Sequence, residues 1–118
     1  MDTQLKKGLI DICVLKCLAK GDSYGYQLIT DVSKYIEVSE STLYPILKRL
    51  EEQMALTTYK EEHNNRIRKY YKITKKGEER LAEQIKEISK LKPIIKFIEG
   101  GKKDDKKWVF KSFRKWTK

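Results

Sequence analysis

The chain has 118 residues, and its 27 lysines and arginines against 17 aspartates and glutamates give a formal net charge of +10. A chain of this length forms one domain with a modest core and leaves little room for a buried active-site cleft. It shows neither a cationic leader before an apolar stretch nor an apolar run of about 20 residues, so we expect a cytoplasmic protein without a membrane span.

The positive charge lies in the second half of the chain. Residues 1–60 carry 8 cationic and 8 anionic side chains, whereas residues 61–118 carry 19 cationic and 9 anionic ones. With a sequence pI of about 9.5, this excess indicates a polyanionic partner, either nucleic acid or an anionic membrane surface.

Two helices are predicted first. Residues 5–19 place apolar side chains at roughly helical spacing, and Asp22 or Ser23 can cap a second helix over residues 24–36. The expected inner face of the second helix consists of Tyr26, Ile29, Val32 and Ile36.

The first helix contains both cysteines of the chain. Cys13 and Cys17 are four residues apart and therefore share a helix face. Because they lack the CxxC spacing and no second Cys/His pair follows, we expect buried structural thiols and no metal site, with redox sensing as the alternative.

A third helix is predicted near residues 41–52. Pro45 is tolerated only near its first turn, so the helix should begin near Ser41. Its core stripe is Leu43, Ile46, Leu47 and Leu50, and its opposite face shows Thr42, Tyr44, Pro45, Lys48 and Arg49.

A β-hairpin is predicted next. Residues 56–60 and 67–73 are rich in β-branched and aromatic side chains, and the polar residues between them indicate a flexible tip. Cations gather there, and alternation along the strand should turn one of Tyr70 and Tyr71 inward to the core.

A long helix should follow from Lys75, with Thr74 as its cap and a kink at Pro93. Its heptad-like apolar seam consists of Leu81, Ile85, Ile88, Leu91, Ile95 and Ile98. A domain this small has no internal surface for so long a seam, so we expect a homodimer built on it.

A basic, aromatic tail begins at the Gly100 pair of glycines. We expect a disordered arm or one that packs its aromatic rings onto the dimer. An accessory DNA-binding arm and a membrane-surface helix are the alternatives.

The order of these elements is that of a winged helix-turn-helix domain with an attached dimerisation helix. The fold class is therefore mainly α with a small β-hairpin (α+β). We expect a winged helix-turn-helix DNA-binding domain in residues 1–74, a dimerisation helix in 75–99 and the basic, aromatic tail in 100–118. In such a domain the third helix enters the major groove of DNA, and the hairpin, or wing, touches the neighbouring backbone.

Three blocks of the sequence resemble the signature blocks of the PadR family of bacterial transcriptional regulators: "KGDSYGYQL" (20–28), "STLYPILKRLEE" (41–52) and "NRIRKYYKITKKG" (65–77). The resemblance implies a homodimeric winged-helix repressor of double-stranded DNA that a small aromatic or lipophilic effector releases. The DNA contacts that it implies fall on Tyr24, Ser41, Thr42, Tyr44, Lys48, Arg66, Arg68 and Lys69. Ser41, Met54 and Asn65 stand where the family usually has glycine.

Two other functions compete with this interpretation. One is a constitutive, ligand-independent DNA-binding repressor of a mobile element, and the other is a basic membrane-surface protein that acts through its tail. We expect neither an enzyme nor a cofactor, because the sequence has no phosphate-binding glycine loop, no metal cluster and no nucleophile–histidine pairing.

Overall fold

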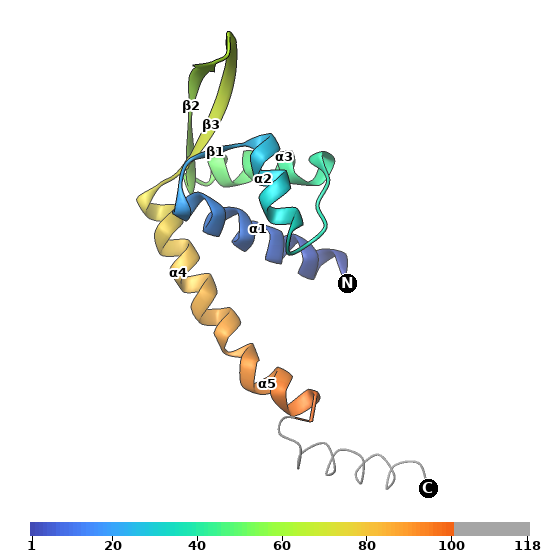
Figure 1. The fold of residues 1–118 in the computed structure, drawn as a ribbon. Helices are drawn as coiled ribbons and strands as arrows, with labels where there is room; N and C mark the ends of the chain where they lie inside the picture. Colours follow the sequence, from blue (N-terminus) through green and yellow to red (C-terminus); the bar gives the residue numbers. More distant parts are fainter. Residues whose placement is uncertain (101–118) are drawn as a thin grey trace, which may run out of the picture. The chain divides into compact units, whose positions relative to one another are not determined.

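The computed structural model describes residues 1–100, so the predicted tail lies outside the described residues from position 101 onward. The elements are α1 (Thr3–Lys20), β1 (Ser23–Tyr24), α2 (Gly25–Ser33), α3 (Glu40–Glu52), β2 (Leu56–His63), β3 (Arg66–Ile73), α4 (Lys75–Ser89) and α5 (Leu91–Ile98) (Figure 1). The predicted class, mainly α with a small antiparallel sheet, is confirmed. The chain forms two compact units, residues 1–84 and the part from Ile85 onward.

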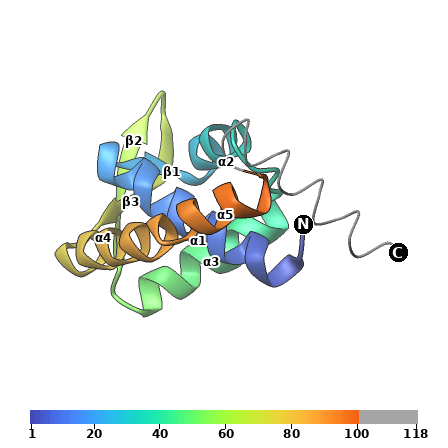
Figure 2. The ribbon, with the colours of Figure 1, turned by 90° about the horizontal axis from the view of Figure 1, so that it is seen from below.

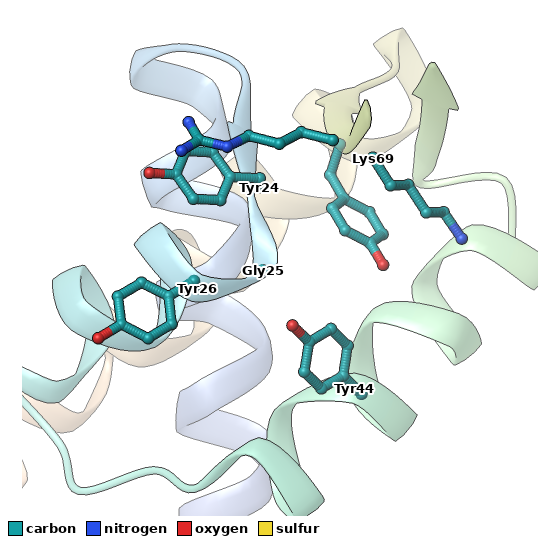
Figure 3. Close-up of a pocket in the computed structure, with 7 residues that line it drawn as sticks. Tyr24, Gly25, Tyr26, Tyr44 and Lys69 are labelled. Carbon is teal, nitrogen blue, oxygen red and sulfur yellow. The ribbon is translucent and has the colours of Figure 1, made fainter. Parts of the chain in front are cut away.

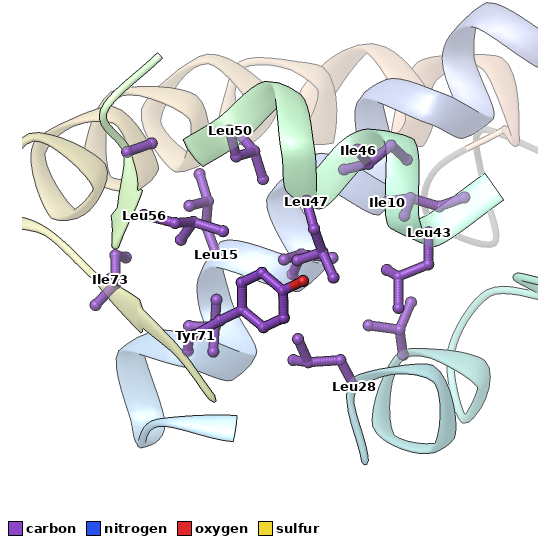
Figure 4. Close-up of a cluster of buried hydrophobic side chains, with 14 of the residues drawn as sticks. Ile10, Leu15, Leu28, Leu43, Ile46, Leu47, Leu50, Leu56, Tyr71 and Ile73 are labelled. Atoms are coloured by element: carbon purple, nitrogen blue, oxygen red, sulfur yellow. The ribbon is translucent and has the colours of Figure 1, made fainter. Parts of the chain in front are cut away.

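The core of the first unit lies among α1, α2, α3 and the sheet. Asp2 caps α1 by accepting a hydrogen bond from the Leu5 amide at 3.1 Å. In the view of Figure 2, α2 and α3 lie to either side of α1. The largest fully buried side chains are Ile10, Val14, Leu15, Leu18, Leu28, Val32, Leu43, Leu47 and Leu50 (Figure 4). Burying each contributes about 1.5–3 kcal/mol before the cost of ordering the chain.

The inner face of α2 differs from the predicted one. Tyr26 is 68% exposed, whereas Leu28 and Val32 are completely buried. Ile29 and Ile36 pack against the core as expected. From Tyr26 to Val32 the predicted stripe runs in two three-residue steps, and each such step turns by about 60° around a helix of 3.6 residues per turn, so Tyr26 leaves the buried face.

Helix α3 begins one residue earlier than predicted and ends in a left-handed residue. Its N-cap is Ser39, and Pro45 lies inside the helix. At the other end Met54 has φ 62°, its amide donates to the Glu51 carbonyl at 3.0 Å, and the Ala55 amide donates to the Leu50 carbonyl at 2.9 Å. This pair of bonds is the Schellman motif that usually places glycine at the position of Met54.

The sheet has three antiparallel strands in the order β1-β3-β2. Strand β1, which the sequence did not predict, pairs Tyr24 with Tyr70. The hairpin is paired up to His63 and Arg66, so its strands extend beyond the predicted residues 56–60 and 67–73. The two remaining tip residues are Asn64 and Asn65, with φ 52° and 64°. Positive φ at both positions is the requirement of a two-residue type I′ turn, and asparagine tolerates it.

Helix α4 starts from a side-chain cap. The Thr74 hydroxyl donates to the Met54 carbonyl at 2.7 Å and accepts from the Gly77 amide at 3.0 Å. Leu81 belongs to the core of the first unit, at 6% exposure. The predicted long helix is interrupted at Lys90, just before the turn that contains Pro93. None of the helices within residues 1–100 is long and apolar enough to cross a membrane.

Candidate nucleic-acid interface

Helix α3 presents an exposed stripe of side chains on the face opposite its core residues. At about 100° per residue, Ser41, Pro45 and Lys48 fall on the side opposite the buried leucines, and all three are exposed. Lys48 makes no ion pair with any described residue. The stripe therefore offers a hydroxyl and a cation to an anionic or hydrogen-bonding partner.

Three hydroxyl groups cluster at the N-terminus of α3. The Ser39 Oγ lies 2.9 Å from the Ser41 Oγ and 3.2 Å from the Thr42 Oγ1, so each pair shares a hydrogen bond. The N-cap makes no side-chain bond to the backbone of the helix. Because the first amides of a helix have no intrahelical acceptor and the helix dipole favours negative charge there, this end suits phosphate oxygens or base edges.

Tyr44 closes one edge of α3 against the start of α2. Its ring lies directly over Gly25, and a Cβ built at Gly25 would come within 2.7 Å of the Tyr44 Cε1. Beside this contact is an open cavity of about 220 Å³, lined by Tyr24, Gly25, Tyr26, Tyr44, Arg68, Lys69 and Tyr71 (Figure 3). Tyr24, Tyr44, Arg68 and Lys69, four of the expected contact residues, thus surround one hollow.

Tyr24 and Arg68 belong to an aromatic array on the outer face of the sheet. The Arg68 guanidinium carbon lies 4.3 Å from the centre of the Tyr24 ring, which meets the Tyr70 ring edge-on with centroids 5.6 Å apart. Tyr70 stacks in turn on Tyr59 at 5.4 Å. The Tyr59 hydroxyl donates to Asp22 at 2.7 Å, and this bond raises the pKa of Tyr59 to about 12. These contacts place the Arg68 guanidinium over the Tyr24 ring at the cavity.

Strand alternation separates the three cations of β3 that were expected to contact DNA. Arg66 and Arg68 lie two residues apart and so share a face of the strand, whereas Lys69 points to the other face. The Lys69 ammonium lies 3.8 Å from the Glu51 carboxylate and 5.4 Å from the centre of the Tyr71 ring. Tyr71 is the inward tyrosine, at 6% exposure. Lys69 is therefore tied to the C-terminal end of α3, and Arg66 lies at the tip.

Two residues lie in environments that differ from the predicted ones. Arg49, which the pattern placed on the exposed face of α3, donates to both oxygens of Asp11 at 2.7 Å and is a structural cation. Tyr26, predicted as core, is exposed at the rim of the cavity near Tyr24 and Tyr44. Its place beside the glycine at the start of α2 is the signal that could have revealed it.

The chain is similar to known transcriptional regulators. The family model described as "Transcriptional regulator PadR-like family" matches residues 14–83. A solved protein of Streptococcus mutans UA159, smu.1704, is 40% identical, with 82% of this chain and 92% of that chain covered and a TM-score of 0.73. A PadR family transcription regulator of Clostridium difficile R20291 is 31% identical over 73% of this chain and 93% of its own, with a TM-score of 0.68.

The fold also matches that of Bacillus subtilis PadR, which was solved in complex with operator DNA. The identity is 22%, the match covers 65% of this chain and 46% of that chain, and the TM-score is 0.61. At this identity the likeness concerns the fold alone.

Proposed function

Since the chain belongs to the PadR-like family of transcriptional regulators, we propose that it is a homodimeric, sequence-specific DNA-binding repressor. Helix α3 enters the major groove, with Ser41, Thr42, Tyr44 and Lys48 toward the bases. The wing, meaning the hairpin of β2 and β3 (residues 56–73), lies along the neighbouring backbone. There Arg66, Arg68 and Lys69 meet phosphates, and Tyr24 approaches the same backbone from β1.

The observation that supports this proposal most is the grouping of these side chains around α3. The hydroxyl cluster at its N-terminus, the exposed Lys48 and the cavity that Arg68 and Lys69 line all belong to the first unit. In the register of the hairpin Lys60 stands opposite Lys69. Like charges directly opposite each other on a sheet repel, and a bound anion would relieve that repulsion. A groove-reading helix flanked by cations matches the docking geometry of winged helix-turn-helix domains.

The proposal is tested by selecting binding sites from a random double-stranded DNA library with the full chain. Fluorescence anisotropy then compares the selected site with random DNA for the wild type and for Thr42→Val. We expect the substitution to cost about 1–3 kcal/mol on the selected site and less on random DNA, because a base-reading hydrogen bond is lost. Lys16→Ala on α1 is the matched control and should change neither affinity. A library that yields no enriched sequence would contradict sequence-specific binding.

We also propose, from membership of the family alone, that a small effector releases the repressor from DNA. A lipophilic or aromatic compound that binds the folded dimer should lower its affinity for the selected site. Anisotropy of the preformed complex, followed across a panel of such compounds, measures this directly. If every compound leaves the complex intact, the constitutive repressor is the better description.

A further inference from the structure

Asp11 of α1 is the one charged residue that is buried within residues 1–100, at 6% exposure. Its carboxylate accepts two hydrogen bonds of 2.7 Å from Arg49 of α3. Arg80 of α4 approaches the same carboxylate at 3.8 Å and also donates to the side chain of Gln53, the C-cap residue of α3. One carboxylate therefore joins three helices.

Stability alone does not explain a charged group at this place. Taking a carboxylate out of water is costly, and well-packed apolar side chains often replace a buried ion pair with no loss of stability. In some proteins a buried ionic or polar group instead fixes one arrangement among several. The arrangement that Asp11 fixes is the rotation and position of α3 relative to α1 and α4.

The geometry of α3 shows why that rotation matters. Arg49 lies seven residues after Thr42, which is within about 20° of the same direction around the helix. The edge that Arg49 anchors is thus the edge that bears Thr42. Tyr44 over Gly25, and Glu51, which accepts from the Thr58 hydroxyl at 3.1 Å, hold the opposite edge. A small rotation of α3 at Asp11 would displace Thr42 and Lys48 together.

We propose that Asp11 is a positioning residue for DNA recognition, through which the placement of α4 sets the presentation of α3 to the major groove. The inference rests on the proposed function. Arg80 is the member on α4, and that helix runs without a break from Lys75 to Ser89, across the border between the two units. A change of α4 is thereby passed to Asp11, from Asp11 to Arg49, and from Arg49 to the base-reading end of α3.

The test uses the full chain and the specificity ratio, defined as the affinity for the selected site divided by that for random DNA. Arg80→Gln keeps the pair of Asp11 and Arg49 and removes both contacts from α4, to Asp11 and to Gln53. Gln53→Ala removes the second contact alone and should leave the ratio unchanged. Asp11→Asn keeps the shape of the side chain and removes the charge. Lys86→Gln, an exposed charge loss on the same helix, is the matched control. We expect Arg80→Gln and Asp11→Asn to lower the ratio by about fivefold, and the control to leave it unchanged.

Three further readouts separate positioning from mere stability. Urea unfolding establishes that each variant is folded under the binding conditions. The backbone amide resonances of Ser41 and Thr42 should shift in Arg80→Gln, although both lie far along α3 from the substitution. The double variant should be no worse in specificity ratio than Asp11→Asn alone, because Arg80 acts through Asp11.

A specificity ratio that stays constant in Arg80→Gln and Asp11→Asn, with only the unfolding free energy changed, would overturn the proposal and leave Asp11 a structural residue. Additive losses in the double variant would also overturn it, since Arg80 would then act by another route. If the wild type itself shows no preference for any selected sequence, the proposed function fails first and the inference falls with it.

Discussion

Met54 adopts a backbone conformation that residues other than glycine rarely take. Its φ of 62° closes the Schellman motif after α3, and its side chain is 67% exposed. A left-handed conformation costs an L-residue about 1–2 kcal/mol. We therefore predict that Met54→Gly raises the free energy of unfolding by about 0.5–1 kcal/mol, because the greater freedom of glycine in the unfolded chain cancels part of the relief.

Urea denaturation of Met54→Gly and of Gln53→Gly measures this effect. Gln53 precedes Met54 and has φ −84°, so glycine relieves no strain there. Gln53→Gly also removes the hydrogen bond that Gln53 accepts from Arg80, so it should lower the free energy of unfolding by about 1–2 kcal/mol. Equal losses in both variants would show that the contacts of the Met54 side chain outweigh its strain.

Asp11 titrates differently in the folded and the unfolded chain. Burial raises the pKa of Asp11 above 3.8, and the charges of Arg49 and Arg80 only partly lower it. The folded chain therefore binds this proton more tightly than the unfolded chain does. The contribution of Asp11 to the free energy of unfolding is complete below the unfolded pKa and is lost as pH rises through the folded pKa.

Asp11→Asn carries no titrating group at this position, so it isolates that contribution. We predict that the free energy of unfolding of the wild type, minus that of the variant, falls as pH rises from the ordinary pKa of an aspartate through the raised pKa of Asp11. Chemical denaturation at a series of pH values provides both quantities. A difference that increases with pH would mean that the two arginines lower the pKa more than burial raises it.

At the scale of single elements, periodicity predicted the long amphipathic helices well and the short or irregular parts poorly. The stripe of Leu43, Ile46, Leu47 and Leu50 is buried as expected, because apolar side chains repeated over two turns define a single helix face that can pack into the core. Strand β1 has two residues and thus no period to detect. It exists because Tyr24 finds a partner in Tyr70 of β3, a pairing that only the tertiary fold creates.

The candidate site shows the same division. Exposure of Ser41 and Lys48 follows from the core stripe of α3, since residues opposite a buried stripe face solvent. The environments of Arg49 and Tyr26 do not follow from it. Arg49 donates to the carboxylate of Asp11, which lies 38 residues earlier in the chain. Tyr26 points outward because α2 packs through Leu28 and Val32.

The wing is the element whose binding should depend most on salt. Arg66 is exposed beside the two-residue tip, and it pairs with His63 across the hairpin. Each phosphate that a cation neutralises contributes about −0.9 to the log–log salt dependence of affinity. In a two-fold dimer Arg66→Ala removes two such contacts, so we predict that the slope flattens by roughly 2.

Anisotropy between low and moderate salt, on the selected site and on random DNA, measures that slope. Both DNAs should lose affinity by similar factors, because phosphate contacts carry no sequence information. Lys16→Ala on α1 is again the matched loss of charge and should leave the slope as it is. A loss confined to the selected site would instead make Arg66 a reader of base edges.

At the scale of the whole molecule, α4 changes its role along its length. Leu81 is committed to the core of the first unit, whereas Ile85 is 45% exposed, and Ile88 is half-buried. Helix α5 continues the apolar character, and its side chains Leu91, Ile94, Ile95 and Ile98 are 44% to 68% exposed. At about 100° per residue these four share one side of α5, with Lys92 and Lys96 on another. Exposed apolar stripes of this kind mark an interaction surface.

The last prediction is that this stripe holds the homodimer together. Leu91→Glu combined with Ile95→Glu places two charges in the proposed interface, where each would be desolvated without a partner. We expect a monomer in sedimentation velocity and a loss of affinity for the selected site, because a monomer can engage only one half-site. Lys96→Glu makes a comparable change of charge on the polar side of the same helix, and it should remain a dimer. A double variant that still sediments as a dimer would place the interface elsewhere and remove α5 from it.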